Sequence, residues 1–114
     1  MKIVNLTPHD IVLMNEYDRV QVTLPSAGVA RAKVDIIPVG TLVLDGEFIP
    51  LVESHYGEPV DLPEPAEDVA YIVSLVTAQA AREHGRTTDD LLLVQKLVRD
   101  GDGQVIGARA LSRL

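Results

Sequence analysis

A histidine and two arginines are the side chains of this chain whose chemistry points most directly to a site. His9 follows Thr7 and Pro8 and precedes Asp10 in a compact polar segment, residues 5–10. There, an imidazole could act as a general base or contact an anion. Alternatively, Thr7 and Asp10 organise a turn through backbone hydrogen bonds, while Pro8 sets φ and His9 fills space. Both interpretations stay open from the residues alone.

Arg31 and Arg109 are the candidates for charge recognition. Arg31 lies two residues before Lys33, so on a strand both side chains project from one face. Such a pair either binds Glu or Asp of the same chain or forms an anion site, where guanidinium offers bidentate geometry to phosphate or carboxylate. Arg109 shares a period-2 face with Val105 and Leu111 that looks buried, where an arginine needs a partner or a ligand. The opposite face is apolar too, so which of the two is buried stays open.

The sequence predicts no metal site, no cofactor and no catalytic nucleophile. The three histidines fall in different expected elements with no H-x-H or H-x-x-x-H spacing, and there is no cysteine. None of the serines stands in a G-x-S-x-G elbow. Gly101 and Gly103 belong to a hairpin turn, not to a strand-to-helix phosphate loop. The residues therefore favour binding over catalysis.

Length and charge narrow the class of protein. The 114 residues predict a single domain, residues 1–114, and the formal charge of −7, from 10 basic and 17 acidic residues, argues against duplex nucleic acid as a partner. A small anionic ligand needs only two or three local cations and stays possible. With no signal-peptide pattern and no apolar run as long as a membrane span, we expect a cytoplasmic protein without a membrane partner.

Short strands separated by turn signals must position these residues. Alternating residues predict strands over 19–24 and 29–36, and a further strand over 41–44 opens after Pro38-Val39-Gly40. Hairpin turns are predicted at 15–18, 45–46 and 100–103. Further strands are expected at the start of the chain and in the ranges 47–52, 69–73, 91–94, 96–98 and 104–111.

One helix is predicted, over residues 75–84, with Ser74 as the N-cap and Gly85 after its end. Residues 53–68, rich in proline and acidic side chains, are expected to form a loop, either a lid over a site or a solvated acidic connector. The order of elements predicts an α+β fold: a mostly antiparallel curved sheet or partial β-barrel with one helix. Its many strand edges favour a homo-oligomer.

Four motifs in order give the chain a resemblance to a family of small proteins from bacteriophages, prophages and actinobacteria. They are Asn5-Leu6-Thr7-Pro8-His9, Pro25-x-x-Gly28-x-Ala30-Arg31, Tyr71-Ile72-Val73-Ser74 and Arg99-Asp100-x-x-Gly103-x-x-x-Gly107. By size, expected fold and phage character the chain is also similar to phage anti-defence sponges of the anti-Thoeris type. That analogy implies sequestration of a cyclic nucleotide-like signal by an oligomer, and it assigns no residue.

The leading functional prediction is non-enzymatic binding of a small phosphorylated, nucleotide-like signal by a homo-oligomer in the host cytoplasm. Arg31 and Arg109 are the predicted phosphate contacts, Thr7 and His9 the polar orienting groups, and Tyr71 or Tyr56 the stacking surface. One alternative is an enzyme that acts on a nucleotide phosphoester with His9 as base. The other is a structural or protein-interaction module of phage origin.

Overall fold

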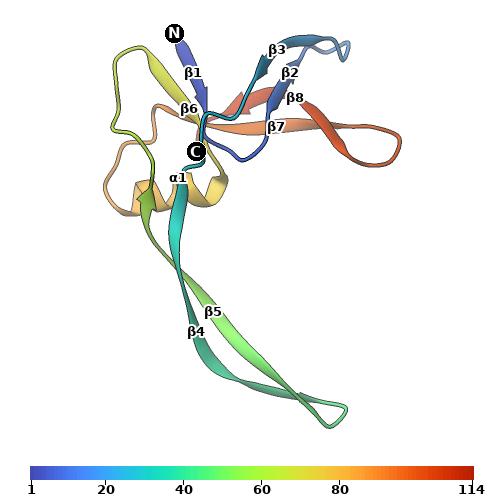
Figure 1. Ribbon diagram of the computed structural model, residues 1–114, viewed down its shortest axis with the longest axis vertical. Helices are drawn as coiled ribbons and strands as arrows, with labels where there is room; N and C mark the ends of the chain where they lie inside the picture. The colour runs from blue at the N-terminus through green and yellow to red at the C-terminus, as the bar shows by residue number, and fades with distance from the viewer.

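The computed structural model describes residues 1–114 and consists of eight β-strands and one short α-helix (Figure 1). The class predicted from the sequence is confirmed: the chain is mostly β, with one helix. The elements, in chain order, are β1 (Lys2–Asn5), β2 (Ile11–Met14), β3 (Val20–Leu24), β4 (Arg31–Leu44), β5 (Glu47–Val60), β6 (Val69–Ile72), α1 (Leu75–Glu83), β7 (Leu91–Arg99) and β8 (Val105–Ser112).

Six of the strands form one mixed sheet in the order β1-β6-β7-β8-β2-β3. The β2–β3 and β7–β8 pairs are antiparallel hairpins, whereas β1–β6, β6–β7 and β2–β8 are parallel. Parallel neighbours need a crossover connection, and α1 supplies it between β6 and β7. The sheet curves until its ends nearly meet, where Asn5 of β1 pairs with Ser26 just after β3. The predicted partial barrel is therefore confirmed.

The helix begins and ends where its capping residues dictate. The Ser74 hydroxyl accepts a hydrogen bond from the Thr77 backbone N–H, as expected of an N-cap. At the other end Gly85 has φ +81°, and the N–H groups of Gly85 and Arg86 donate to the carbonyls of Arg82 and Ala81. This is a Schellman motif, and it confirms the predicted stop after His84.

The hydrophobic core lies between α1 and the strands β6 and β7. Its buried members are Leu6, Ala30, Tyr71, Val73, Ala78, Ala81, Leu91 and Leu93. Small alanines on the helix allow close approach to the sheet, and the Thr77 hydroxyl on the same face donates to the carbonyl of Ala30. Only 17 of the 114 residues are buried, so this core is small and most of the chain does not contribute to it.

The remaining two strands, β4 and β5, form a separate hairpin of 14 residues per strand (Figure 1). We call this hairpin, residues 31–60, the arm. Its tip is Asp45-Gly46, with φ angles of +50° and +79°, the left-handed pair that a tight hairpin turn requires. The turn signal at 45–46 is thus confirmed. Only Ala32 within the arm is buried.

Two strand boundaries predicted from the sequence are wrong in the arm. Residues 53–60 are not a loop, because Glu53 to Val60 continue β5 and pair with β4 down to Arg31. Acidic and proline residues are tolerated there because the ribbon lies in solvent and does not cross a core. The expected break at Pro38-Val39-Gly40 is a β-bulge inside one continuous β4. Only residues 61–68 connect the arm to β6.

Other turns follow the sequence closely. The β2–β3 hairpin turns at residues 15–18, and β7–β8 turns at 100–103, as predicted. The two short strands expected at 91–94 and 96–98 are one strand, β7, which continues through Lys96 although that residue has φ +52°. The single helix is neither long nor apolar enough to cross a membrane.

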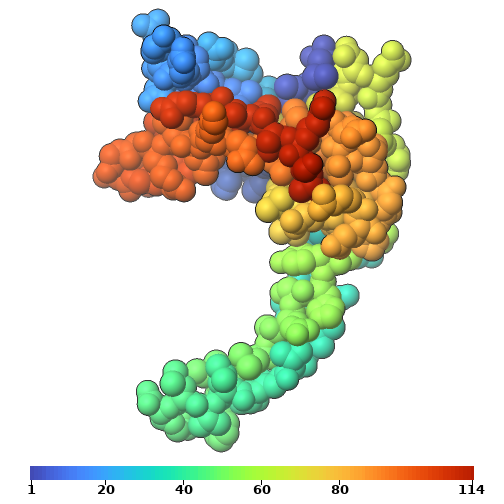
Figure 2. All heavy atoms as spheres, turned by 180° about the vertical axis from the view of Figure 1, so that it is seen from behind, coloured from blue at the N-terminus to red at the C-terminus, as the bar shows by residue number.

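The arm gives the molecule an extended outline. Its radius of gyration is 17.7 Å, whereas a compact domain of this length has about 13 Å. The accessible surface is 7793 Å², compared with about 6,100 Å² for a compact monomer of the same mass. We call the rest of the chain, residues 1–30 and 61–114, the body. In the space-filling view of Figure 2 the arm curves away from the body and touches it only at its base.

Candidate functional site

The polar segment between β1 and β2 is organised around the side chain of Asn5. This amide is 1% exposed and makes all four of its hydrogen bonds. Nδ2 donates to the carbonyls of His9 (2.7 Å) and Leu24 (2.9 Å). Oδ1 accepts from the backbone N–H of Thr7 (3.0 Å) and from its hydroxyl (2.6 Å). A buried amide with every donor and acceptor satisfied rigidifies its surroundings.

The same segment joins the two ends of the sheet. The Ser26 hydroxyl donates to the Thr7 carbonyl at 2.6 Å, and the Ser26 N–H reaches the Asp10 carboxylate at 3.3 Å. Backbone N–H groups of Ala27 and Ala30 donate to the carbonyls of Asn5 and Leu6. The segment therefore acts as the clasp that holds β1 against the chain after β3. The sequence drew attention to His9 here, whereas the central residue is Asn5.

Thr7 and His9 take different parts in this clasp. The Thr7 hydroxyl bonds within it, to Asn5 Oδ1 and the His9 carbonyl. His9 contributes only that backbone carbonyl, and its exposed imidazole has no hydrogen-bond partner. No carboxylate orients the ring, and no hydroxyl lies in hydrogen-bond reach of it. Thr7 bonds locally as the turn-forming interpretation expects, whereas the carboxylate of Asp10 bonds to Ser26 across the clasp and not within the turn.

The two predicted phosphate contacts belong to different parts of the molecule. Arg109 on β8 is exposed and forms an ion pair with Asp18 of the β2–β3 turn through Nε and Nη2. The burial expected from the sequence is therefore wrong, whereas Asp18 is a partner of the kind that the expectation called for. Arg31 begins β4 at the base of the arm and takes part in none of the five ion pairs of the structure. Lys33 pairs with Glu58 across the arm at 3.3 Å.

The two candidate stacking residues also differ. Tyr71 is 6% exposed and belongs to the hydrophobic core, so its ring packs against aliphatic side chains and offers no face to a ligand. Tyr56 lies on β5 and is about half exposed. The structure thus does not bring Thr7, His9, Arg31, Tyr71 and Arg109 into one site.

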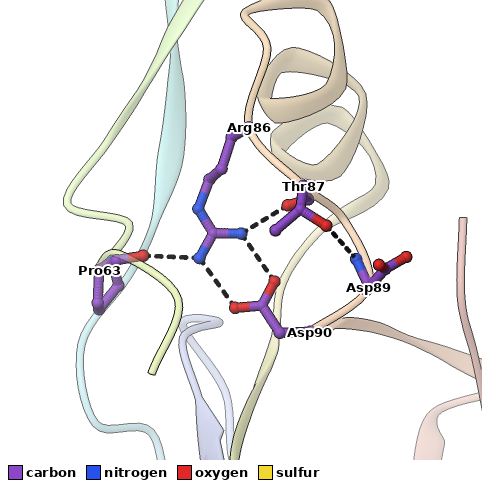
Figure 3. A network of polar contacts seen from close by, with 5 residues as sticks. All are labelled: Pro63, Arg86, Thr87, Asp89 and Asp90. Atoms are coloured by element: carbon purple, nitrogen blue, oxygen red, sulfur yellow. Dashed lines mark hydrogen bonds and ion pairs between the residues drawn. The ribbon is translucent and has the colours of Figure 1, made fainter. Parts of the chain in front are cut away.

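An ion pair that sequence reasoning missed holds the connection after the helix. From its place beyond the helix end, Arg86 would be expected to contact C-terminal carbonyls or solvent. Its guanidinium instead makes two contacts with the Asp90 carboxylate, at 2.8 and 3.0 Å, and both side chains are only 13% exposed (Figure 3). It also donates to the carbonyls of Thr87 and Pro63. Arg86 thereby ties the 61–68 connector to the helix and β7.

The hollows of the surface do not gather positive charge. Four cavities are present, and of the five sequence-predicted residues only Arg109 lines one. One cavity of about 320 Å³ is bordered by Asp68, Asp89 and Asp90 together with Arg113 and the amino terminus, which pairs with Asp68, so its carboxylates outnumber its cations. Another of about 340 Å³ is bordered by Glu58 and Glu64 together with Arg86, whose charge Asp90 already balances. No three His, Asp or Glu side chains come together as metal ligands do.

The arm exposes many apolar side chains that no other part of the chain covers. Of the 21 large hydrophobic side chains that are exposed, 12 lie on it. They are Val34, Ile36, Ile37, Val39, Leu42, Val43, Leu44, Phe48, Ile49, Leu51, Val52 and Tyr56. Contiguous apolar surface of this kind marks an interaction site in a water-exposed protein. A two-stranded ribbon is also marginally stable by itself. The arm is therefore the candidate functional surface.

The two faces of the arm differ in charge. Residues directly opposite each other in the ladder share a face, and successive residues alternate. One face contains no charged side chain from Val34 to the tip. We call it the uncharged face, and its cross-strand pairs are Val34–Tyr56, Ile36–Ser54, Pro38–Val52, Thr41–Pro50 and Val43–Phe48. The other, the charged face, carries Asp35, Glu47, Glu53 and His55 among its apolar residues.

No protein-family model, curated protein or solved structure matches this chain. The resemblance to small phage and actinobacterial proteins stays a prediction from the sequence motifs.

Proposed function

We propose that this protein is a non-enzymatic interaction module that assembles with copies of itself through the arm. The observation that carries the proposal is the concentration of exposed apolar side chains on a hairpin that the rest of the chain does not cover. Phe48, next to the tip, is 76% exposed. Burying one such side chain stabilises a complex by about 1.5–3 kcal/mol. A row of them exposed to water therefore raises the free energy of the monomer relative to an oligomer that covers them.

The surface area supports the same proposal. The chain exposes about 1,700 Å² more than a compact monomer of its mass would. One partner in an interface of standard size buries about 800 Å². The excess is therefore large enough for a stable interface.

Oligomeric mass tests this function directly. Sedimentation velocity over a wide range of protein concentrations would be compared for the wild type and a variant in which residues 37–53 are replaced by Asn-Gly. Ile36 and Ser54 are directly opposite, so a two-residue turn can join them. We expect an oligomeric wild type and a monomeric variant. The far-ultraviolet spectrum of the variant should differ from that of the wild type only by the contribution of the deleted strand residues. A wild type that stays monomeric at every concentration would overturn the proposal.

Binding of a nucleotide-like ligand is a second proposal, and one observation favours it. Arg31 is an exposed guanidinium without an ion pair in an acidic chain, so it is available to an anionic group. Calorimetric titration with cyclic ADP-ribose isomers and cyclic dinucleotides tests this. Heat that Arg31→Ala abolishes and Lys33→Ala preserves would support it, whereas no heat across the panel would refute it. Unchanged nucleotide recovered from the complex would count against the enzymatic alternative.

A further inference from the structure

We infer that the arms of two copies pack face to face through their uncharged faces, as a two-layer ribbon sandwich with two-fold symmetry. This inference rests on the proposed function, because it names the surface and the partner through which assembly occurs. The partner is the same face of a second copy, and the side chains at its centre are those of Thr41, Pro50, Pro38 and Val52.

Exposure distinguishes the two faces. The large apolar side chains of the uncharged face are 47–76% exposed: Val34, Ile36, Val43, Phe48, Val52 and Tyr56. Those in the ladder of the charged face are 39–60% exposed: Ile37, Leu42, Leu44, Ile49 and Leu51. The uncharged face also has both aromatic rings of the arm. It therefore presents more unburied apolar surface to a partner, and it does so along the whole ribbon.

Charge explains why this face suits a second copy. Each chain carries a formal charge of −7, so two copies repel each other, and acidic groups inside the contact surface would add to that repulsion. Packing the charged face on itself would bring Glu53, which contacts His55, and the unpaired carboxylates of Asp35 and Glu47 of both copies into one dry interface, where each unpaired carboxylate is costly. The uncharged face incurs no such penalty, and an identical partner face is complementary to it by two-fold symmetry.

Prolines make the alternative, edge-to-edge pairing of ribbons, less favourable. Pro38 lies in β4 and Pro50 in β5, so each free edge of the arm lacks a backbone donor near its middle. Prolines on exposed edges are a common device against strand addition. Stacking of faces needs no backbone donor, and two sheets stack at a separation of about 10 Å. The ribbon is thus suited to pairing by its side chains.

A matched pair of substitutions tests which face is used. Val52→Glu places a charge at the centre of the uncharged face, and Leu51→Glu places the same charge one residue away on the charged face. Both side chains are exposed in the single chain, so both variants are expected to fold. By sedimentation velocity we expect a dimeric wild type, a monomeric Val52→Glu variant and a dimeric Leu51→Glu variant.

Thiol labelling gives a second readout that does not disturb the interface with charge. The chain has no cysteine, so Ser54→Cys on the uncharged face and His55→Cys on the charged face each supply one thiol. In the assembled protein we expect slow labelling at position 54 and fast labelling at position 55. Equal rates at both positions, or dissociation by Leu51→Glu as complete as by Val52→Glu, would overturn the face assignment.

The outcomes separate this inference from the proposed function. If the wild type is a monomer, assembly itself fails. If shortening the arm dissociates the oligomer while Val52→Glu leaves it intact, the arm mediates assembly through another surface and only the inference fails. If oligomers larger than a dimer dissociate when the arm is shortened, yet the Ser54→Cys variant labels fast, the arm docks on the body of a neighbour. That result would also overturn the face-to-face arrangement.

Discussion

The body and the arm are built from the same kind of sequence, short alternating strands joined by Gly- and Asp-containing turns. They differ in how many of their side chains are buried. In the body, the β7–β8 hairpin packs buried residues such as Val98 and Ala108 against its neighbours. In the arm, a hairpin with an equally good turn has only Ala32 buried. Turn chemistry makes a hairpin in both places, but burial gives stability to only one of them.

The difference also separates two roles for polar groups. In the body, the Asn5 amide is buried with all four of its hydrogen bonds made, and the Arg86–Asp90 ion pair is only 13% exposed. On the arm, the Lys33–Glu58 pair is exposed, with both side chains 64% accessible. We therefore expect substitutions in the body to change its free energy of unfolding, and substitutions on the arm to change assembly.

The largest loss of stability is expected for Arg86→Ala. It leaves the Asp90 carboxylate, only 13% exposed, without its partner and removes the bond to Pro63, at a cost of about 3 kcal/mol. Urea denaturation of the arm-shortened protein measures this without interference from assembly. Arg82→Ala, on the exposed last turn of the helix, is the matched control and should change the free energy of unfolding little. Equal losses for both variants would contradict the assigned role of the ion pair.

Asn5→Ala should cost somewhat less, about 2 kcal/mol, because it leaves partly buried carbonyl and N–H groups of the clasp without their partner. The same denaturation experiment measures it. Asn15→Ala removes two bonds from an exposed turn and should cost less than half as much. If the Asn15 variant proves the less stable of the two, the clasp does not hold the sheet together as argued.

A smaller loss, about 1 kcal/mol, is expected when Ser74→Ala removes the N-cap of α1. Thermal unfolding followed by circular dichroism checks it. Ser54→Ala on the arm, where the hydroxyl has no partner, is the control and should leave the midpoint unchanged in dilute protein. An equal effect at both serines would show that the arm is coupled to the stability of the body.

The smallest effect on the body should come from shortening the arm. Replacing residues 37–53 by Asn-Gly removes no buried side chain, so the free energy of unfolding of the monomer should change by less than about 0.5 kcal/mol. Unfolding at low protein concentration measures it. A loss of several kcal/mol would mean that the arm is part of the folding unit and would erase the distinction between the two regions.

Local residues determined much of the fold. The helix could be predicted to within a residue because Ser74 and Gly85 cap it by bonds to its own backbone. The turns at 15–18, 45–46 and 100–103 follow from residues that tolerate or favour left-handed backbone conformations, as Asp18, Asp45, Gly46 and Gly103 show. Alternation of apolar and polar residues predicted strands at 19–24 and 29–36, where β3 and the start of β4 lie. Each of these signals acts over a few neighbouring residues, so each can be read in sequence.

Only the tertiary structure decided which strands have a core to cover and which charges have partners. The alternation along 29–36 is the same whether the strand enters the body or projects from it, and only the fold shows that β4 and β5 project beyond their base without cover. Arg109 met Asp18 across 91 positions, and Arg86 met Pro63 across 23, at separations that no local pattern encodes. The physical reason is that burial and ion pairing depend on contacts between distant segments, whereas turns and caps depend on the chain's own neighbours.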